Sequence, residues 1–287
     1  MCVERKAGHA MVRDFYDDVV IELLRDGVLD TGMRVLVVCG GRTDRLVMER
    51  CGFRDVVISN LGVRPAGRDL GSFGWSEQDS ERLGFDDESF DFVVVHSGLH
   101  HCYSPHRALL EMYRVARRGV LLFEPYDNLL TRVGVRLGIG QEYEYAGVAG
   151  DLGRDGHRGG VADTTIPNFV YRFTEREIVK TVHSYAPYAR HDIRFFYRMR
   201  IPWGHLRLRR NRGLYLAVRL ARPVLKLVEV CAPRQSNNFA ALILKPDLSR
   251  TLHPWLRRTD GAVEVNSDWL ATRYRTITAP RPSRQRS

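Results

Sequence analysis

The sequence predicts a doubly wound α/β fold, and two observations predict it. The apolar run Arg34–Cys39 ends in the pair Gly40-Gly41 and leads into a helix. The segment Leu83–Pro125 then reads as an acidic turn, a buried strand, a histidine-rich loop, an amphipathic helix, a glycine turn and a second buried strand. Repeated strand–loop–helix units form a parallel sheet, and such sheets bind ligands beyond the carboxyl ends of their strands.

The elements follow in chain order from hydropathy spacing and turn residues. Amphipathic spacing predicts a first helix within His9–Leu29 that packs on the sheet. Apolar runs predict strands at Arg34–Cys39, Asp55–Ser59, Phe92–His96, Gly119–Phe123, His191–Met199 and Asn238–Lys245. Helical spacing predicts helices at Thr43–Cys51, Pro105–Ala116 and Thr174–Tyr185, the last opened by a Thr-x-x-Glu capping box. The remaining segments before residue 83 are a glycine-rich loop, Gly62–Gly74, and a short polar stretch, Ser76–Arg82.

The composition is that of a globular protein, with 44% hydrophobic residues and a net charge of +10. Basic residues dominate between Arg190 and Lys226, which favours acidic partners such as phosphate groups, sugar acids or anionic lipid headgroups. Nucleic acid is an unfavoured partner, because no basic and aromatic residues interleave as an RNA-binding platform requires. Scattered cysteines, the lack of a signal-peptide pattern and the lack of an apolar run of about 18 residues predict a cytoplasmic protein without a transmembrane helix.

The loop after the first strand has the features of a ligand site. Gly40 and Gly41 let the backbone approach a ligand closely, and the next helix offers free N–H groups to a polar ligand. A tight turn explains the same glycine pair equally well, and the G-x-G-x-x-G spacing of nicotinamide and flavin sites is absent. Asn60 ends the second strand, where its amide can bond two hydroxyls, and the Asp79 carboxylate can accept from an adenine amino group. Asn60 as a turn residue and Asp79 as a helix cap are the structural alternatives.

Six segments between Val35 and Pro125 together resemble a known family. They are VLVVCGG, VVISN, DSERLGF, SFDFVVV, GLHHCYSP and LLEMYRVARRGVLLFEP. In this order they are similar to the class I S-adenosylmethionine-dependent methyltransferases. The resemblance implies a Rossmann-like sheet of seven mostly parallel strands with an inserted cap, S-adenosyl-L-methionine as cofactor, and methylation as the activity. The sequence departs from the family where Val37 or Val38 stands for an acidic residue, where Asn60 stands for another, and where the glycine pattern is shorter.

The resemblance also implies a set of cofactor-binding residues at the strand ends. They are Cys39, Gly40, Gly41, Asp44, Asn60, Asp79, Ser80 and His96. Because the glycine pattern is short and the usual acid is missing, we expect the cofactor contacts to depend on backbone groups, Asp44 and Asp79.

Methyl transfer from a sulfonium is an in-line displacement, which needs a nucleophile near the methyl carbon and often a base for its proton. His101, His100 and Glu124 are the predicted catalytic residues, because they follow the strands that border the crevice. The structural alternatives are a histidine that bonds the loop backbone and a glutamate that holds loop N–H groups. Further candidates for the base are His96, Tyr126 and Asp127. No metal is predicted, since no set of Cys, His and acidic residues, His106 included, has the spacing of a closed site.

The chain divides into five predicted segments. Residues 1–30 are an N-terminal helical segment, and residues 31–125 are the Rossmann-like core that binds the cofactor. Residues 126–173 are a cap or lid, because an insertion of this length in a compact domain is usually functional. The second half of the sheet, residues 174–246, carries an inserted basic amphipathic helix at 202–233. Residues 247–287 are a tail that docks on the body through LHPWLRR and SDWLATRY and ends in disorder.

The expected acceptor is a small molecule, a sugar or glycan intermediate or a secondary metabolite, methylated on oxygen, nitrogen or a carboxyl group. Tyrosines of the cap can stack on such a molecule: Tyr126, Tyr143, Tyr145 and Tyr171. Gly150–Gly160 is a candidate flap, and its His157 is a further catalytic candidate. Residues 212–230 predict peripheral contact with an anionic membrane at the inner face. Packing on the domain, or a homodimer interface, explains the same pattern.

Two other functions fit parts of the sequence. A non-catalytic adaptor for a membrane or protein partner, on a degenerate methyltransferase fold, fits the altered glycine loop and the basic helix. A nicotinamide-dependent oxidoreductase fits the fold class, but the missing G-x-G-x-x-G and the Leu-His-His segment count against it.

Overall fold

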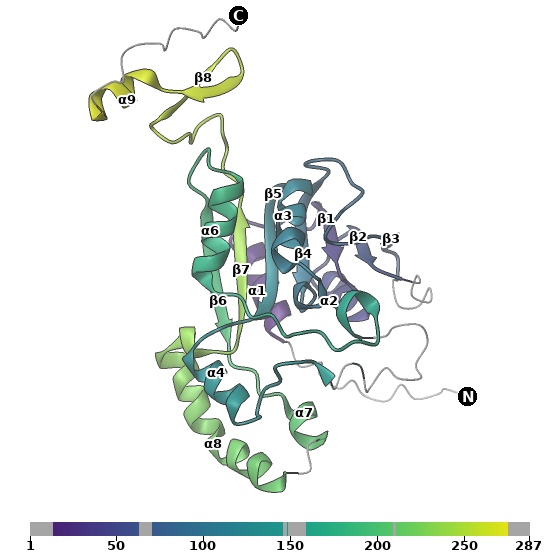
Figure 1. Ribbon diagram of the computed structural model, residues 1–287. Coiled ribbons are helices and arrows are strands. Elements are labelled where there is room, and N and C mark those ends of the chain that lie inside the picture. Colours follow the sequence, from purple (N-terminus) through teal and green to yellow (C-terminus); the bar gives the residue numbers. More distant parts are fainter. Residues whose placement is uncertain (1–13, 63–70, 146–147, 149–158, 209–210, 275–287) are drawn as a thin grey trace, which may run out of the picture.

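The computed structural model describes residues 14–62, 71–145, 148, 159–208 and 211–274. Its centre is a seven-stranded sheet in the order β3-β2-β1-β4-β5-β7-β6 (Figure 1). β1 to β5 pair in parallel, and β7 is antiparallel to both of its neighbours, β5 and β6. The strands are β1 (Arg34–Val38), β2 (Asp55–Asn60), β3 (Gly74–Glu77), β4 (Phe90–His96), β5 (Ala116–Pro125), β6 (Asp192–Arg198) and β7 (Asn238–Leu244). The predicted seven-stranded, mostly parallel Rossmann-like fold is confirmed.

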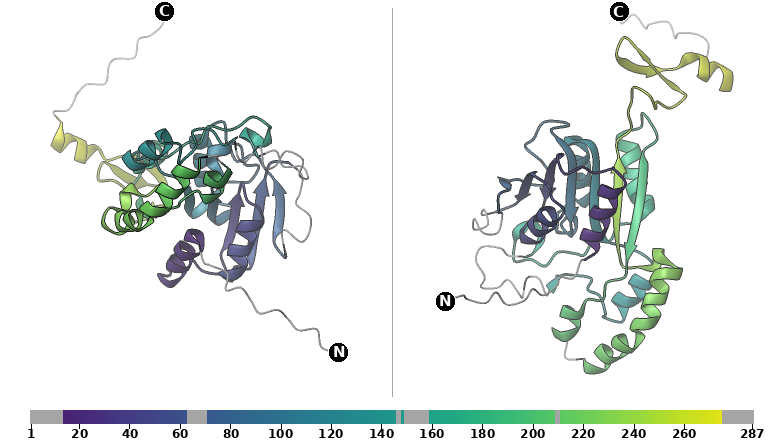
Figure 2. Two further views of the ribbon diagram at one scale, coloured as in Figure 1. Left: turned by 90° about the horizontal axis from the view of Figure 1, so that it is seen from below. Right: turned by 180° about the vertical axis from the view of Figure 1, so that it is seen from behind.

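Helices cover both faces of the sheet and bury two separate cores. α1 (Phe15–Arg25) and α2 (Arg42–Arg50) pack on one face, and α3 (Pro105–Val115) and α6 (Glu175–Tyr185) pack on the other (Figure 2). In β1 the side chains alternate between these cores, and all four residues from Val35 to Val38 are at most 1% exposed. Because both faces are covered, the central strands are continuous apolar runs, which made them easy to predict.

The inserted segments gather at the end of the sheet where the parallel strands finish. The 3₁₀ turn η2 (Leu99–His101) follows β4, and α4 (Leu129–Arg136) follows β5. A further 3₁₀ turn, η3 (Val161–Asp163), lies in the cap. The connection from β6 to β7 contains α7 (Trp203–Leu208), α8 (Arg212–Cys231) and η4 (Pro233–Gln235). β4, β5 and β6 run in the same direction, so these segments all leave the sheet at its carboxyl edge.

One expectation about local structure was wrong, and a second was correct only in part. Gly74–Glu77 was divided between a loop and a polar segment, but it forms the edge strand β3 beside β2. Its side chains are half-buried or exposed, so its sequence lacks the apolar pattern of the central strands. The tail docks on the body only where LHPWLRR begins: Leu252 bridges to Ala189, and His253 N donates to the Tyr188 carbonyl at 3.0 Å. The hairpin of β8 (Leu256–Thr259) and β9 (Ala262–Val265), with α9 (Ser267–Arg273), stands apart from the sheet (Figures 1 and 2). Trp255 and Trp269 pack against each other instead, with ring centroids 5.7 Å apart.

The helix ends agree with their capping residues. α1 begins at Phe15 because the Asp14 side chain accepts hydrogen bonds from the Tyr16 and Asp17 backbones. The predicted capping box at Thr174 and Glu177 opens α6. None of the helices in the described ranges combines the length and hydropathy needed to cross a membrane.

Candidate active site

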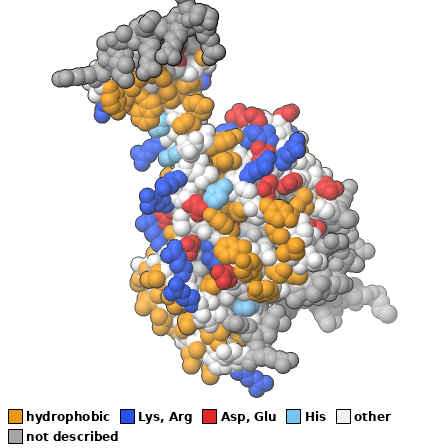
Figure 3. Space-filling model, viewed as in Figure 1, with side chains coloured by type: hydrophobic (Ala, Val, Ile, Leu, Met, Phe, Trp, Pro, Cys, Tyr) orange, Lys and Arg blue, Asp and Glu red, His pale blue; other side chains and the backbone are white. Residues whose placement is uncertain are grey.

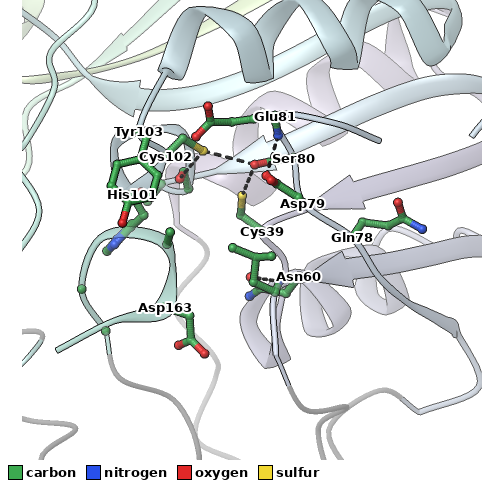
Figure 4. A pocket seen from close by; sticks show the side chains of 16 residues that line it. Cys39, Asn60, Gln78, Asp79, Ser80, Glu81, His101, Cys102, Tyr103 and Asp163 are labelled. Carbon is green, nitrogen blue, oxygen red and sulfur yellow. Dashed lines mark hydrogen bonds between the residues drawn. The ribbon is translucent and has the colours of Figure 1, made fainter. Parts of the chain in front are cut away.

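A cavity of about 440 Å³ opens at the carboxyl ends of β1, β2 and β4 (Figure 4). Five residues predicted to be functional line it: Cys39, Asn60, Asp79, Ser80 and His101. Residues that the sequence analysis did not identify also line it, among them Gln78, Ser97, Tyr103 and Asp163. The order of the strands reverses between β1 and β4, so the cavity lies at the switch point where open α/β sheets bind ligands.

The floor of the cavity is made of strained backbone at two strand ends. Cys39 follows β1 with φ of 51°, and Ser97 follows β4 with φ of 55°. Residues other than glycine seldom adopt these left-handed values, which cost about 1–3 kcal/mol each. Gly98 lets the two loops touch, since a Cβ on it would lie 2.4 Å from the Cys39 Cβ. Such strain concentrates at functional sites, and here both strained residues line the same cavity.

Asn60 and Asp79 each form hydrogen bonds within the protein, and each can form further hydrogen bonds to a ligand. Asn60 Nδ2 donates to the Gly40 carbonyl at 3.2 Å, and Asn60 Oδ1 accepts from Leu61 N at 2.8 Å, so Asn60 ties the end of β2 to the β1 loop. Asp79 Oδ1 accepts from Glu81 N at 2.9 Å. Among the described residues, Asp79 Oδ2 has no hydrogen-bond donor, and it remains available on the cavity wall.

Ser80 joins three chain segments around the cavity. Its Oγ lies 3.1 Å from the Cys102 Sγ and 3.5 Å from the Cys39 Sγ (Figure 4). The hydrogen bond with the Cys39 thiol, together with burial, raises the pKa of Cys102 far above its usual range. Cys102 is therefore a neutral thiol that packs the site, and its sulfur is a poor nucleophile.

Glu124 holds the loop after β4. The Glu124 side chain is buried, and its Oε1 accepts from Gly98 N at 2.9 Å and from Leu99 N at 2.7 Å. Its Oε2 lies 2.7 Å from His100 Nδ1. Burial alone would lower the pKa of His100, but the Glu124 carboxylate outweighs burial and raises it to about 10. In this arrangement His100 is an imidazolium and Glu124 is its partner, so neither is free to accept a proton.

The pKa values of His101 and His96 are lowered, whereas that of His100 is raised. Burial, followed by the neighbouring His100, lowers the pKa of His101, so its imidazole is neutral at neutral pH. Burial also lowers the pKa of His96, whose ring stacks on Tyr16 with centroids 4.8 Å apart. His96 faces a second cavity of about 240 Å³, and Ser97 lines both cavities.

Four residues predicted to bind the cofactor lie outside the larger cavity: Gly40, Gly41, Asp44 and His96. Gly40 is needed for packing, since a Cβ there would lie 2.8 Å from Val37 Cγ1 and 2.9 Å from Ile58 Cγ2. Asp44 is buried beneath the loop, where its Oδ2 accepts from Gly41 N at 2.9 Å. The loop residues therefore shape the cavity without forming its wall.

Residues 55–123 match the family model of a methyltransferase domain. This part of the chain is similar to a methyltransferase domain. The match spans β2 to β5 and the loops at their carboxyl ends, and it confirms the resemblance to class I methyltransferases predicted from the sequence. The methyl donor of this class is S-adenosylmethionine, and the residues present fit it: polar Asn60 and Asp79 line a cavity at the sheet's switch point.

Curated relatives and solved structures are similar to parts of the chain. The ubiquinone/menaquinone biosynthesis C-methyltransferase UbiE of Xanthomonas oryzae pv. oryzae is 36% identical over 100 residues, which cover 31% of this chain and 40% of that protein. UbiE of Idiomarina loihiensis is 32% identical over 107 residues, covering 32% and 43%. The chain thus spans about two fifths of the length of these relatives. The YcgJ protein of Bacillus subtilis has 13% identity and a TM-score of 0.47, with 80% of this chain and 99% of that chain covered. A magnesium protoporphyrin IX methyltransferase of Synechocystis with bound SAH has 14% identity and a TM-score of 0.43, with 80% and 82% covered.

Within the described ranges, the remaining residues predicted to act in catalysis or acceptor binding do not line either cavity. His106 Nε2 lies 2.6 Å from Glu177 Oε1, so His106 links α3 to α6. Tyr126 is buried against Phe239 and is a core residue. Tyr143 and Tyr145 are exposed on the cap. His157 and most of the candidate flap, residues 149–158, lie outside the described residues.

Proposed function

We propose that this chain is an S-adenosylmethionine-dependent methyltransferase that acts on a small-molecule acceptor. The observation that carries the proposal is the larger cavity, because most of its lining residues lie in the segment that matches a methyltransferase domain, and two strained strand ends border it. When bound, the cofactor supplies an electrophilic methyl group. Asn60 would hold ribose hydroxyls through its remaining amide capacity, and the free Asp79 Oδ2 would accept from the adenine amino group.

The second cavity supports an assignment for the acceptor. It meets the cofactor cavity at Ser97, so an acceptor there would be within reach of a methyl group beside Ser97. Arg200 lines this second cavity, and its guanidinium forms no ion pair with any described residue, whereas Arg198 is paired with Asp18 at 2.8 Å. We therefore favour an acceptor that carries a carboxylate or phosphate near the methylated group. Sugar acids, glycan intermediates and acidic secondary metabolites have this chemistry.

His101 is the proposed general base. It lines the cofactor cavity as a neutral imidazole, while Glu124 and His100 position the loop that carries it. His96 is the alternative base, because it lines the acceptor cavity. Replacement of the base by alanine should lower turnover at least a hundredfold and leave the affinity for S-adenosylmethionine nearly unchanged. The assay is transfer of a radiolabelled methyl group to a panel of acidic sugars and phenols. Measuring His101→Ala and His96→Ala in parallel shows which histidine is the base. Full activity of both variants would reject both assignments.

Calorimetric titration tests the proposed function first. We expect S-adenosylmethionine and S-adenosylhomocysteine to bind with micromolar dissociation constants, and NADH to give no heat of binding. If neither sulfur compound binds, the methyltransferase proposal fails and the non-catalytic adaptor is favoured.

We further propose that α8 contacts an anionic membrane peripherally. Its inner side chains pack toward the protein, and its outer apolar residues are 53–79% exposed: Leu216, Leu220, Val224, Leu227 and Val230. Figure 3 shows hydrophobic side chains gathered over the region of α4 and α8 beside a row of Lys and Arg. The exposed Arg219, Arg222 and Lys226 flank the apolar stripe, and this charge complements anionic lipid headgroups.

Vesicle co-sedimentation tests this contact. The protein should sediment with vesicles containing phosphatidylglycerol and remain in solution with pure phosphatidylcholine. Leu220→Glu should release it, whereas Val265→Glu, which alters an exposed apolar residue of β9, should not. If wild-type protein stays in solution and sediments as a dimer in the ultracentrifuge that Leu220→Glu dissociates, the stripe is a dimer interface and the membrane proposal is wrong.

A further inference from the structure

Two histidines and a glutamate meet where the cap touches the loop after β4. His100 and His101 come from η2, and Glu144 comes from the cap segment between α4 and η3. One ligand atom from each of the three lies within 4.8 Å of the others. Sequence spacing predicted no metal site because Glu144 is far along the chain, and only the folded cap brings it to the histidine pair.

The distances in this cluster are longer than good hydrogen bonds. Glu144 Oε2 lies 3.5 Å from His100 Nε2 and 3.4 Å from His101 Nε2, whereas N–H···O bonds are usually about 2.7–3.2 Å long. Two ligand atoms bound to a tetrahedral Zn²⁺ at about 2.0–2.1 Å are about 3.4 Å apart. Both distances from Glu144 therefore match the spacing of two ligand atoms on one metal ion, and the ligand atoms of the three residues all lie within 4.8 Å of one another.

A buried carboxylate orients the first histidine toward this point. His100 Nδ1 lies 2.7 Å from Glu124 Oε2, which leaves His100 Nε2 directed at Glu144. Glu124 is itself fixed by the backbone N–H groups of Gly98 and Leu99. A metal-binding histidine usually has such a carboxylate on its other ring nitrogen.

An unpartnered amide oxygen supports the same site. Asn168 is 2% exposed, and its Oδ1 is buried without a hydrogen-bond partner in the described part of the chain. Its Nδ2 donates to the His100 carbonyl at 3.1 Å and lies 3.5 Å from Glu144 Oε2. A buried acceptor left without a donor calls for an explanation, and a water or ion bound beside Asn168 would supply one.

We propose that His100, His101 and Glu144 bind one divalent transition-metal ion, which fastens the cap to the loop after β4. Two imidazoles and a carboxylate are a ligand set for Zn²⁺ or Fe²⁺, with coordination positions left for water or a substrate oxygen. Metal binding does not depend on the proposed methyl transfer. The imidazolium assigned to His100 above also applies to the metal-free protein, because metal binding displaces the proton from His100 Nε2. With the metal bound, His101 Nε2 is a ligand and does not act as the base, so the base assignment above applies to the metal-free protein.

Zinc titration of chelator-treated full-length protein tests the site. We expect one Zn²⁺ per chain, and Co²⁺ should bind with the visible absorption of a protein-ligated ion. Glu144→Gln should weaken Zn²⁺ binding at least tenfold, and Glu124→Gln should weaken it about tenfold through the orientation of His100. Glu177→Gln is the matched control, because Glu177 pairs with His106 away from the cluster, and it should bind Zn²⁺ like the wild type.

The outcomes separate this proposal from the proposed function. Failure of the wild-type protein to bind Zn²⁺ or Co²⁺ at 1:1 stoichiometry, or equal affinity of the wild type and Glu144→Gln, would overturn the metal site. The same samples are titrated with S-adenosylmethionine in the presence of chelator. Cofactor binding that persists there upholds the methyltransferase proposal whatever the metal result. Thermal unfolding of each variant confirms that it is folded.

Discussion

Replacing Asp44 by asparagine should stabilise the folded chain at neutral and alkaline pH. The Asp44 residue is 5% exposed at the first turn of α2, and its Oδ2 accepts from Gly41 N. Its Oδ1 is buried without a hydrogen bond of normal geometry among the described residues, although the Tyr16 hydroxyl helps to lower the pKa of this carboxyl. Burial raises the pKa of Asp44 to about 6, and the Gly41 hydrogen bond offsets only part of this effect. An amide of the same shape keeps an acceptor for Gly41 and carries no charge to desolvate.

The magnitude follows from the two pKa values. The pKa of Asp44 is 3.8 when unperturbed and about 6 in the fold, so the folded state holds this proton more tightly than the unfolded chain. This tighter proton binding makes its full contribution to the free energy of unfolding below pH 3.8, and the contribution is lost as the pH rises through 6. At about 1.4 kcal/mol for each tenfold change in the acid constant, the loss is about 3 kcal/mol at pH 8 and about 1.5 kcal/mol at pH 5. The asparagine variant should recover these amounts.

Urea unfolding at pH 5 and pH 8 measures the effect. We expect Asp44→Asn to raise the free energy of unfolding at both pH values, by about twice as much at pH 8. Asp30→Asn, at an exposed aspartate, should show no such dependence. Destabilisation at pH 8, or an equal gain at both pH values, would refute the reasoning. Because Asp44 lies outside the cavity, the affinity for S-adenosylmethionine should not change, and a large loss would restore Asp44 as a cofactor contact.

Two further substitutions test the cavity. Asp79→Ala should weaken S-adenosylmethionine binding about tenfold, which is the loss of one hydrogen bond to a charged group; an unchanged dissociation constant in calorimetry would reject its role at the adenine. Gly98→Ala places a Cβ 2.4 Å from the Cys39 Cβ, so it should push the two loops apart, lower the free energy of unfolding by about 2 kcal/mol and reduce cofactor affinity. Wild-type stability of this variant in urea unfolding would show that the loops are not in forced contact.

The central fold was predictable because its signals are local. β1 and β4 are buried on both faces, so any sequence that forms them must be a continuous apolar run. β3 does not have to be a continuous apolar run. It pairs only with β2 within the described sheet, and its side chains are half-buried or exposed. The tail shows the converse error in part. Leu252 and His253 of LHPWLRR contact the body as expected, but Trp255 and Trp269 pack on each other instead.

The site was predictable where strand ends determine it. Cys39 and Asn60 end neighbouring parallel strands, so the topology alone brings them to one edge of the sheet. Asp163 and Glu144 were not found, because the cap has no regular pattern and its position depends on tertiary contacts. The roles of His100 and Glu124 also could not be separated from the sequence, since both readings require the same residue types, and only the 2.7 Å contact identifies them as partners.

The unfavourable features of this chain converge on the neighbouring loops after β1 and β4. Cys39 and Ser97 have left-handed backbone angles, and Asp44 holds a carboxylate in a buried position beside Gly41. Each costs free energy that a smoother loop would avoid, and the well-packed β1 and β4 beneath them can offset that cost. Sequences usually break local rules where function requires a particular geometry. The concentration of these exceptions in and beneath the loops that border one cavity is therefore an argument from energetics for the proposal that this cavity is the working site.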